Sequence, residues 1–186
     1  MLEHRLHHLA LTAAWALGLL GCGGAEEAGL GTDAVLDAEV EPVPLVSAQW
    51  VPTDADPFPA HRPADATCPT GSTAVEFDAL EIQTGWCTYL VVGQPLAADI
   101  AAGDTLHLLA WHGNLTAPER AAGHIAIAVD GDAVWEATVA IPALAEVYDI
   151  TWISDRAHPA GSPVVLHLHN HGYNTWLFAK LERLAR

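Results

Sequence analysis

The sequence predicts an all-β fold: an antiparallel β-sandwich of about eight strands, closed as a jelly roll, after a disordered tether. From Cys68 onward, apolar and polar residues alternate with a period of two, the pattern of a strand with one buried face. Turn residues such as Gly, Pro, Asn and Asp interrupt this alternation at short intervals. Short antiparallel strands in this number close most naturally as two packed sheets.

The strands follow from this alternation in order. The first is expected at 75–82, with a bulge at Asp78-Ala79, where the alternation slips by one residue. A strong hairpin signal, Asp130-Gly131-Asp132, separates two of the others. The remaining strands are expected at 86–92, 105–111, 124–130, 133–141, 147–153, 164–170 and 174–184. A helix is the alternative for the last segment, because 176–186 also fits helical spacing.

The N-terminus has the features of an export signal. Residues 9–21 form an apolar run that follows Arg5 and ends at Cys22. This run is shorter than the roughly 20 residues that a membrane-spanning helix needs, and is typical of a signal peptide. The sequence therefore predicts three parts: a signal peptide at 1–21, a tether at 22–66 and a β domain at 67–186. An ordinary secretory peptide cut near Gly21 is the alternative to the lipoprotein signal considered next.

The stretch Leu19-Leu20-Gly21-Cys22 resembles the lipobox of bacterial lipoproteins. This resemblance implies that Cys22 is lipidated and becomes the mature N-terminus, anchored to a membrane. Gly23 stands where an Asp would imply retention in the inner membrane, so the resemblance favours an outer-membrane lipoprotein of the cell envelope, periplasmic or surface-exposed. The net charge of −16 argues against binding to nucleic acid or anionic lipid, so the acyl chains would supply the membrane attachment.

The tether is rich in Ala, Glu, Asp, Gly and Pro, a composition that buries little. Its patch 46–51, which contains Trp50, could fold back as an edge segment. After Cys22 is assigned to lipid, Cys68 and Cys87 remain as an even pair. The oxidising environment of an exported protein predicts a disulfide between them.

The turn at 102–105, the strand ending in Trp111 and the motif Asn174-Thr175-Trp176 resemble the galactose-binding-like jelly rolls of many carbohydrate-binding modules. The resemblance covers about 68–184 and implies this fold and a glycan or another small extracellular ligand. The residues that we expect to contact the ligand are aromatic or polar and lie near the last hairpin: Trp111, His112, Tyr173, Asn174 and Trp176.

A histidine cluster lies in the next-to-last strand. His167, His169 and His171 should share one face if Leu166 and Leu168 point into the core. Imidazoles at this spacing could bind zinc or copper, with further ligands from His112 or His124.

Two other roles for the cluster remain open, a hydrogen-bonded structural network and catalytic proton transfer. The sequence marks no carboxylate pair for glycoside hydrolysis and no nucleophile elbow around a serine. We therefore expect a non-catalytic ligand-binding lipoprotein, with a metal-binding protein or metal-dependent enzyme as the alternative.

The lipobox generates a first prediction. A Cys22→Ser variant should move from the membrane fraction to the soluble fraction, because it loses the acyl chains that anchor it. Gly24→Ser is the matched control and should remain with the membrane. Fractionation and the intact mass of the mature protein measure both effects. A variant that stays on the membrane, together with a wild type that carries no acyl mass, would contradict the lipoprotein assignment.

Overall fold

The computed structural model describes residues 41–185. The expected signal peptide, the lipidation site Cys22 and the first part of the tether lie outside these residues. No helix in the described part of the chain is both long and apolar enough to cross a membrane.

Eleven β-strands and one short 3₁₀ turn make up the regular structure of residues 41–185. Their bounds are β1 Val43–Pro44, β2 Val51–Pro52, η1 Pro59–His61, β3 Thr73–Glu76, β4 Ala79–Gln83, β5 Tyr89–Pro95, β6 Thr105–His112, β7 Ala121–Val129, β8 Asp132–Ile141, β9 Glu146–Ile153, β10 Pro163–Asn170 and β11 Thr175–Arg183.

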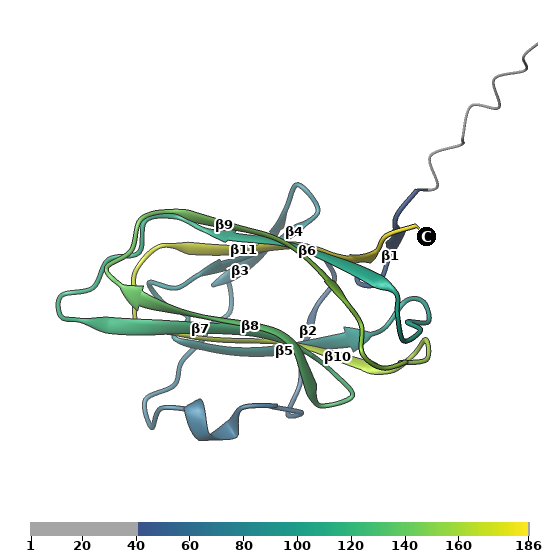
Figure 1. The fold of residues 1–186 in the computed structure, drawn as a ribbon. Helices are drawn as coiled ribbons and strands as arrows, with labels where there is room; N and C mark the ends of the chain where they lie inside the picture. Colours follow the sequence, from purple (N-terminus) through teal and green to yellow (C-terminus); the bar gives the residue numbers. More distant parts are fainter. Residues whose placement is uncertain (1–40, 186) are drawn as a thin grey trace, which may run out of the picture. The chain divides into compact units, whose positions relative to one another are not determined.

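The strands form two antiparallel sheets that face each other (Figure 1). Sheet A has the order β3-β4-β11-β6-β9, with β1 added to β11, and sheet B has the order β2-β5-β10-β7-β8. From β4 onward, consecutive strands change sheet except at the β7–β8 hairpin, and β4–β11 give the two four-stranded orders of a jelly roll. The predicted all-β sandwich, with eight principal strands closed as a jelly roll, is therefore confirmed.

The core lies between the inner faces of the two sheets. Leu166 and Leu168 of β10 are fully buried, as the alternation predicts, and they face a layer from sheet A that includes Leu108 and Phe178. The final segment is a strand, so its helical alternative is wrong. In β11 the inward residues, Trp176, Phe178 and Leu181, are separated by a bulge between Phe178 and Lys180. That irregularity in the alternation explains the ambiguous spacing.

The first predicted strand differs from the structure. Segment 75–82 is a hairpin of β3 and β4 and not a single bulged strand. Phe77 and Asp78 form its two-residue turn, with φ of 50° and 60°, the left-handed values that a type I′ turn requires. The expected 86–92 strand begins later, at Tyr89, and extends to Pro95.

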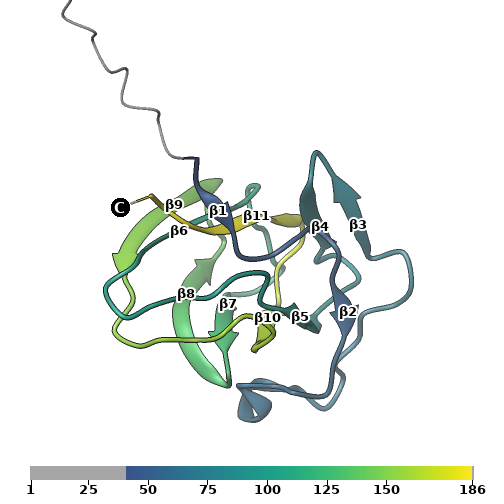
Figure 2. The same ribbon diagram turned by 90° about the vertical axis from the view of Figure 1, so that its right-hand side faces the viewer.

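Residues 41–66, which the sequence assigns to the tether, pack on the sandwich. Leu45 is fully buried, its N–H donates to Leu181, and Trp50 packs edge-on against Phe178 with ring centroids 5.6 Å apart. β1 and β2 extend the two sheets and flank the patch that we expect to fold back, as Figure 2 shows. The ordered domain therefore includes residues N-terminal to position 67, because apolar side chains scattered among the prolines fill gaps in the core.

The predicted Cys68–Cys87 disulfide is present. It generates a second prediction. Replacing both cysteines by serine should lower the free energy of unfolding by about 3 kcal/mol, because the bridge restricts a loop of this length in the unfolded chain. Urea denaturation of wild type and variant measures the difference. Two alkylatable thiols in the freshly exported protein would contradict the assignment.

Candidate functional site

The two sheets differ in what covers their outer faces. Residues 54–67, which we call the crossing segment, run across the outer face of sheet B between β2 and the disulfide (Figure 1). The crossing segment covers Tyr89, Val91 and Val165, which form a small second cluster against Ala66. The outer face of sheet A is open to solvent: Val147 and Ile153 on β9 are 64% and 60% exposed.

A partly buried carboxylate, that of Asp56, holds the crossing segment on sheet B. Asp56 accepts hydrogen bonds from the Tyr89 hydroxyl and, at 2.9 Å, from the backbone N–H of Phe58. Burial alone would raise the pKa of Asp56, but these hydrogen bonds and the neighbouring His167 lower it below its usual value. Burial and the Asp56 carboxylate raise the pKa of Tyr89, so its hydroxyl remains a donor.

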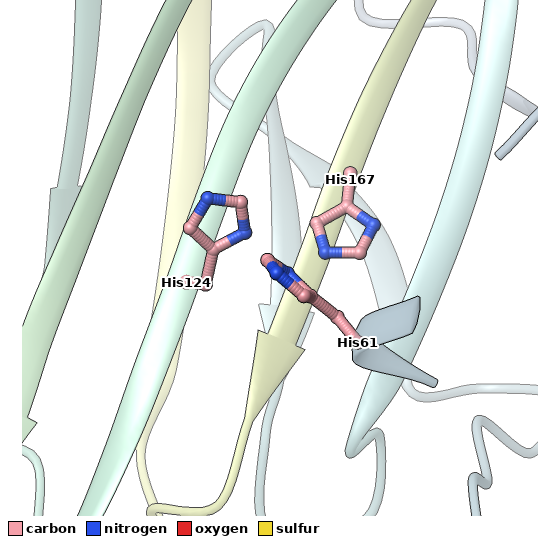
Figure 3. A group of neighbouring side chains, drawn as sticks. All are labelled: His61, His124 and His167. Atoms are coloured by element: carbon pink, nitrogen blue, oxygen red, sulfur yellow. The ribbon is translucent and has the colours of Figure 1, made fainter. Parts of the chain in front are cut away.

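Three histidines converge beneath this fastened segment. His61 comes from η1, His124 from β7 and His167 from β10, and each offers a ring nitrogen within 4.8 Å of those of the other two. Figure 3 shows the side chain of His61 extending to a point between the rings of His124 and His167. We call these residues the histidine triad. Its members come from positions far apart in the chain, so only the folded sandwich brings them together.

The ring nitrogens of His124 and His167 differ in their partners. His124 and Glu136 project from β7 and β8 on the same outer face, and Nε2 of His124 lies 3.0 Å from a Glu136 carboxylate oxygen. Nδ1 of His167 lies 3.3 Å from Asp56 Oδ1, at ion-pair distance but not aligned for a hydrogen bond. Nδ1 of His124 and both nitrogens of His167 are buried and make no hydrogen bond to any described residue.

Two further histidines lie beside the triad. His169 is directly opposite His124 across the β10–β7 pair, and its Nε2 lies 2.7 Å from Nε2 of His171. Together with Thr138, four of these histidines line an open pocket of about 360 Å³: His61, His124, His169 and His171. Two rings of the triad, those of His61 and His124, therefore border space that is large enough for a small ligand.

Burial favours the neutral form of two imidazoles on β10, those of His167 and His169. Burial and the neighbouring His124 and His61 lower the pKa of His167 to about 4, against the opposing effect of Asp56. Burial, together with His171, also lowers the pKa of His169. A neutral imidazole has a lone pair available, so these rings can accept a hydrogen bond or bind a metal ion.

The structure separates the five histidines that the sequence proposed as metal ligands. His167 and His169 share the outer face of β10, and His171 lies beyond the end of the strand against His169. His124 joins His167 in the triad. His112 does not, because it faces the interior from β6, 1% exposed, with its ring beside Trp176. An ion bound by His167 or His124 could not reach it through the sheets.

His61 is the functional candidate that the sequence reasoning missed. It lies in the segment assigned to the tether, where the only local signal is a histidine between Pro59 and Pro63. Its place over β7 and β10 depends on the Asp56 contacts and on the ring of Phe58, which stacks on His61 at 5.3 Å. The stacking is local, but the Asp56–Tyr89 hydrogen bond that fixes the segment on sheet B joins residues far apart in the chain, and sequence spacing could not reveal it.

The residues proposed to contact a glycan are also divided. Trp176 is fully buried and its indole N–H donates to Asn170 at 3.2 Å, so Trp176 and its strand neighbour His112 are interior residues. Trp111 lies on the outer face of sheet A. Tyr173 and Asn174 are exposed in the loop before β11, on the border of the sandwich.

Comparison with protein families and with curated proteins gave no match. Among solved structures, the chain is similar to a CBM4 protein (15% identity, 64% of this chain and 81% of that one, TM-score 0.39). It is also similar to TmCBM61 in complex with β-1,4-galactotriose (10%, 65% and 80%, 0.35). A third match is the catalytic domain of a GH87 α-1,3-glucanase with nigerose (14%, 58% and 22%, 0.34). These likenesses are distant, and the fold assignment rests on the strand order described above.

The buried imidazoles generate a third prediction, for protein kept in chelator. The pKa of His167 is about 4 in the folded protein and about 6.5 in an unfolded chain, so the unfolded state binds more protons between these values. The contribution of His167 to the free energy of unfolding should therefore be fully present above pH 6.5. It should fall by about 3 kcal/mol as the pH drops to 4. Asp56 adds a loss only at lower pH, as its carboxylate becomes protonated.

Urea denaturation at several pH values measures this slope, with His167→Gln as the comparison. The variant should show a shallower dependence between pH 6.5 and 4. Equal slopes in wild type and variant would contradict the buried neutral state of His167.

Proposed function

We propose that the protein is an outer-membrane lipoprotein, anchored through Cys22, whose jelly-roll domain binds a neutral glycan without catalysis. The glycan site is the outer face of sheet A, which we call the open face. The observation that carries the proposal is a row of side chains across four neighbouring strands. Val147, Trp111, Leu177 and Glu81 stand directly opposite one another on β9, β6, β11 and β4.

This row has the chemistry that a sugar ring requires. Residues paired across strands project on the same side, so Val147, Trp111 and Leu177 form an apolar strip against which the C–H face of a sugar can pack. Glu81 ends the strip and accepts a hydrogen bond from the Gln83 side-chain amide. Ligand sites commonly combine an apolar surface with a few polar groups that fix orientation.

Polar groups lie next to the apolar strip on the same strands of the open face. His107 places one ring nitrogen 2.7 Å from Asp149 and the other 2.7 Å from Glu182, and Lys180 is 2.9 Å from the same glutamate. Burial alone would raise the pKa of Glu182, but hydrogen bonds from His107 and Lys180 lower it. The Glu182 carboxylate therefore remains an ionised acceptor held by its partners, and oxygen acceptors of this kind suit the binding of hydroxyl groups.

Charge narrows the class of glycan. The chain has a net charge of −16, so a polyanionic polysaccharide would be repelled at long range. A neutral polysaccharide carries no such penalty. Among the five residues proposed from sequence, Trp111 lies within the open face, and Tyr173 and Asn174 lie on loops near its border.

The location is proposed on the sequence alone. The lipobox-like Leu19-Leu20-Gly21-Cys22, the apolar run before it and the acidic, proline-containing stretch after it support export and lipid anchoring. A binding domain held at the cell envelope by a lipid would meet extracellular or envelope glycans directly.

The open face generates a fourth prediction. Affinity electrophoresis against a panel of soluble neutral polysaccharides should show retardation of the wild-type protein by at least one of them. Trp111→Ala should weaken that binding by about tenfold or more, equivalent to about 1.4 kcal/mol, because it removes the ring from the centre of the row. Val147→Asp, at an exposed position, should weaken it as well by placing a charge in the apolar strip.

Phe77→Ala is the matched control, because Phe77 is an aromatic residue that is fully exposed in the β3–β4 turn. It should bind as the wild type does. Thermal melts establish that the variants are folded. The proposal is wrong if no neutral polysaccharide retards the protein, or if both open-face variants bind as tightly as the control.

A further inference from the structure

We propose that His61, His124 and His167 form a binding site for one divalent transition-metal ion of the zinc class. The site lies on the outer face of sheet B, beneath the crossing segment, and is independent of the glycan site on sheet A. Its ligand set differs from the one that the sequence suggested, because it includes His61 and excludes His112, His169 and His171.

The distances suit a single ion. Ligand nitrogens at about 2.0–2.1 Å from a tetrahedral zinc ion lie roughly 3.3 Å from one another. The triad nitrogens already lie within 4.8 Å of one another. The remaining approach is short, and His61 can provide it because it is exposed and belongs to a short turn, whereas His124 and His167 are held by strands.

Each strand histidine has one ring nitrogen close to a carboxylate and the other with no hydrogen-bond partner among the described residues. Nε2 of His124 faces Glu136 at 3.0 Å, which leaves Nδ1 to bind the ion. Nδ1 of His167 faces Asp56 at 3.3 Å, which leaves Nε2. A carboxylate behind the ligand fixes the tautomer and orientation of the imidazole and increases its basicity, and metal-binding histidines almost always have such a partner.

Nearby negative charge and unpaired buried nitrogens both favour a bound cation. The carboxylates of Asp56 and Glu136 would compensate the charge of a divalent cation placed between the buried rings of His124 and His167. Without an ion, the buried Nδ1 of His124 and the buried nitrogens of His167 are left without hydrogen bonds from the described residues. Buried polar atoms in proteins are rarely left unpaired, and coordination to one ion would satisfy an atom on each ring.

The donor set indicates the class of metal. Three imidazoles suit zinc, copper, nickel or cobalt, whereas calcium and magnesium require oxygen ligands. Three protein ligands leave a fourth position on zinc, and the pocket of about 360 Å³ lined by His61 and His124 provides room for it.

The ion would also join two parts of the fold. His61 belongs to the crossing segment, and the other two ligands belong to β7 and β10. Metal binding should therefore stabilise the attachment of the crossing segment to sheet B, since the site exists only in the folded state.

The test is a titration of tag-free, metal-stripped, full-length mature protein with ZnCl₂, followed by calorimetry and by thermal melts. Wild type should bind one equivalent of Zn²⁺ and melt at a higher temperature with zinc than in chelator. His61→Phe should lower the zinc affinity by about a hundredfold or more, because losing a ligand should cost at least as much as losing a supporting carboxylate. This variant retains a ring to stack on Phe58, so its fold in chelator should match that of the wild type.

His171→Ala is the matched control, because this exposed histidine lines the same pocket but lies outside the triad. It should retain the wild-type affinity within a few-fold. Glu136→Gln should weaken zinc binding by about 10- to 100-fold through the orientation of His124. CaCl₂ should give no heat and no change in melting temperature.

Three outcomes would overturn the proposal. The first is the absence of zinc binding by the wild type. The second is a loss of affinity in His171→Ala together with normal affinity in His61→Phe, which would place the ion on His169 and His171. The third is an equal stabilisation by calcium and zinc, which would show a nonspecific effect of divalent cations.

Discussion

Strand β10 is the constraint on which both faces of sheet B depend. It lies between β5 and β7, so its inward residues Leu166 and Leu168 must fill the core, and the period of a strand then forces His167 and His169 outward. An imidazole at the centre of a sheet would ordinarily face water. Here the crossing segment covers it, and Asp56 provides the charge and hydrogen bonds that make this covering favourable.

The covering of one sheet and the exposure of the other divide the molecule into two chemically distinct surfaces. On sheet B, His167 is fully buried and its surroundings favour the neutral imidazole, a group that binds metal ions. On sheet A, Trp111 and Val147 remain accessible beside carboxylates held by His107 and Lys180, a surface suited to a larger uncharged ligand. Because the core separates these faces, each proposed site can be altered without changing the other.

The alternation of apolar and polar residues was sufficient to predict most strands of the sandwich, but it failed at particular residues. The alternation identified β6 to β11 because each strand directs apolar side chains into the core at every second position, a period that is visible in the local sequence. It placed a bulge where Phe77 and Asp78 make a turn, since Phe is not a residue that sequence rules associate with positive φ. It also treated 41–66 as a tether, because the backbone of Leu45 is held by Leu181 of β11 and by Ala97, which lie far away in the sequence.

The histidine cluster shows why the geometry of a site requires tertiary structure. Histidines two positions apart on one strand are separated by about 6.6 Å at the backbone, about twice the spacing of two nitrogens on one zinc ion. His167 and His169 therefore need large side-chain convergence to share an ion. Histidines from a turn and two neighbouring strands approach the same point from different directions, as His61, His124 and His167 do. Strands β7 and β10 supply His124 and His167, but only the crossing segment, held by Asp56, brings the third ligand, His61, over them.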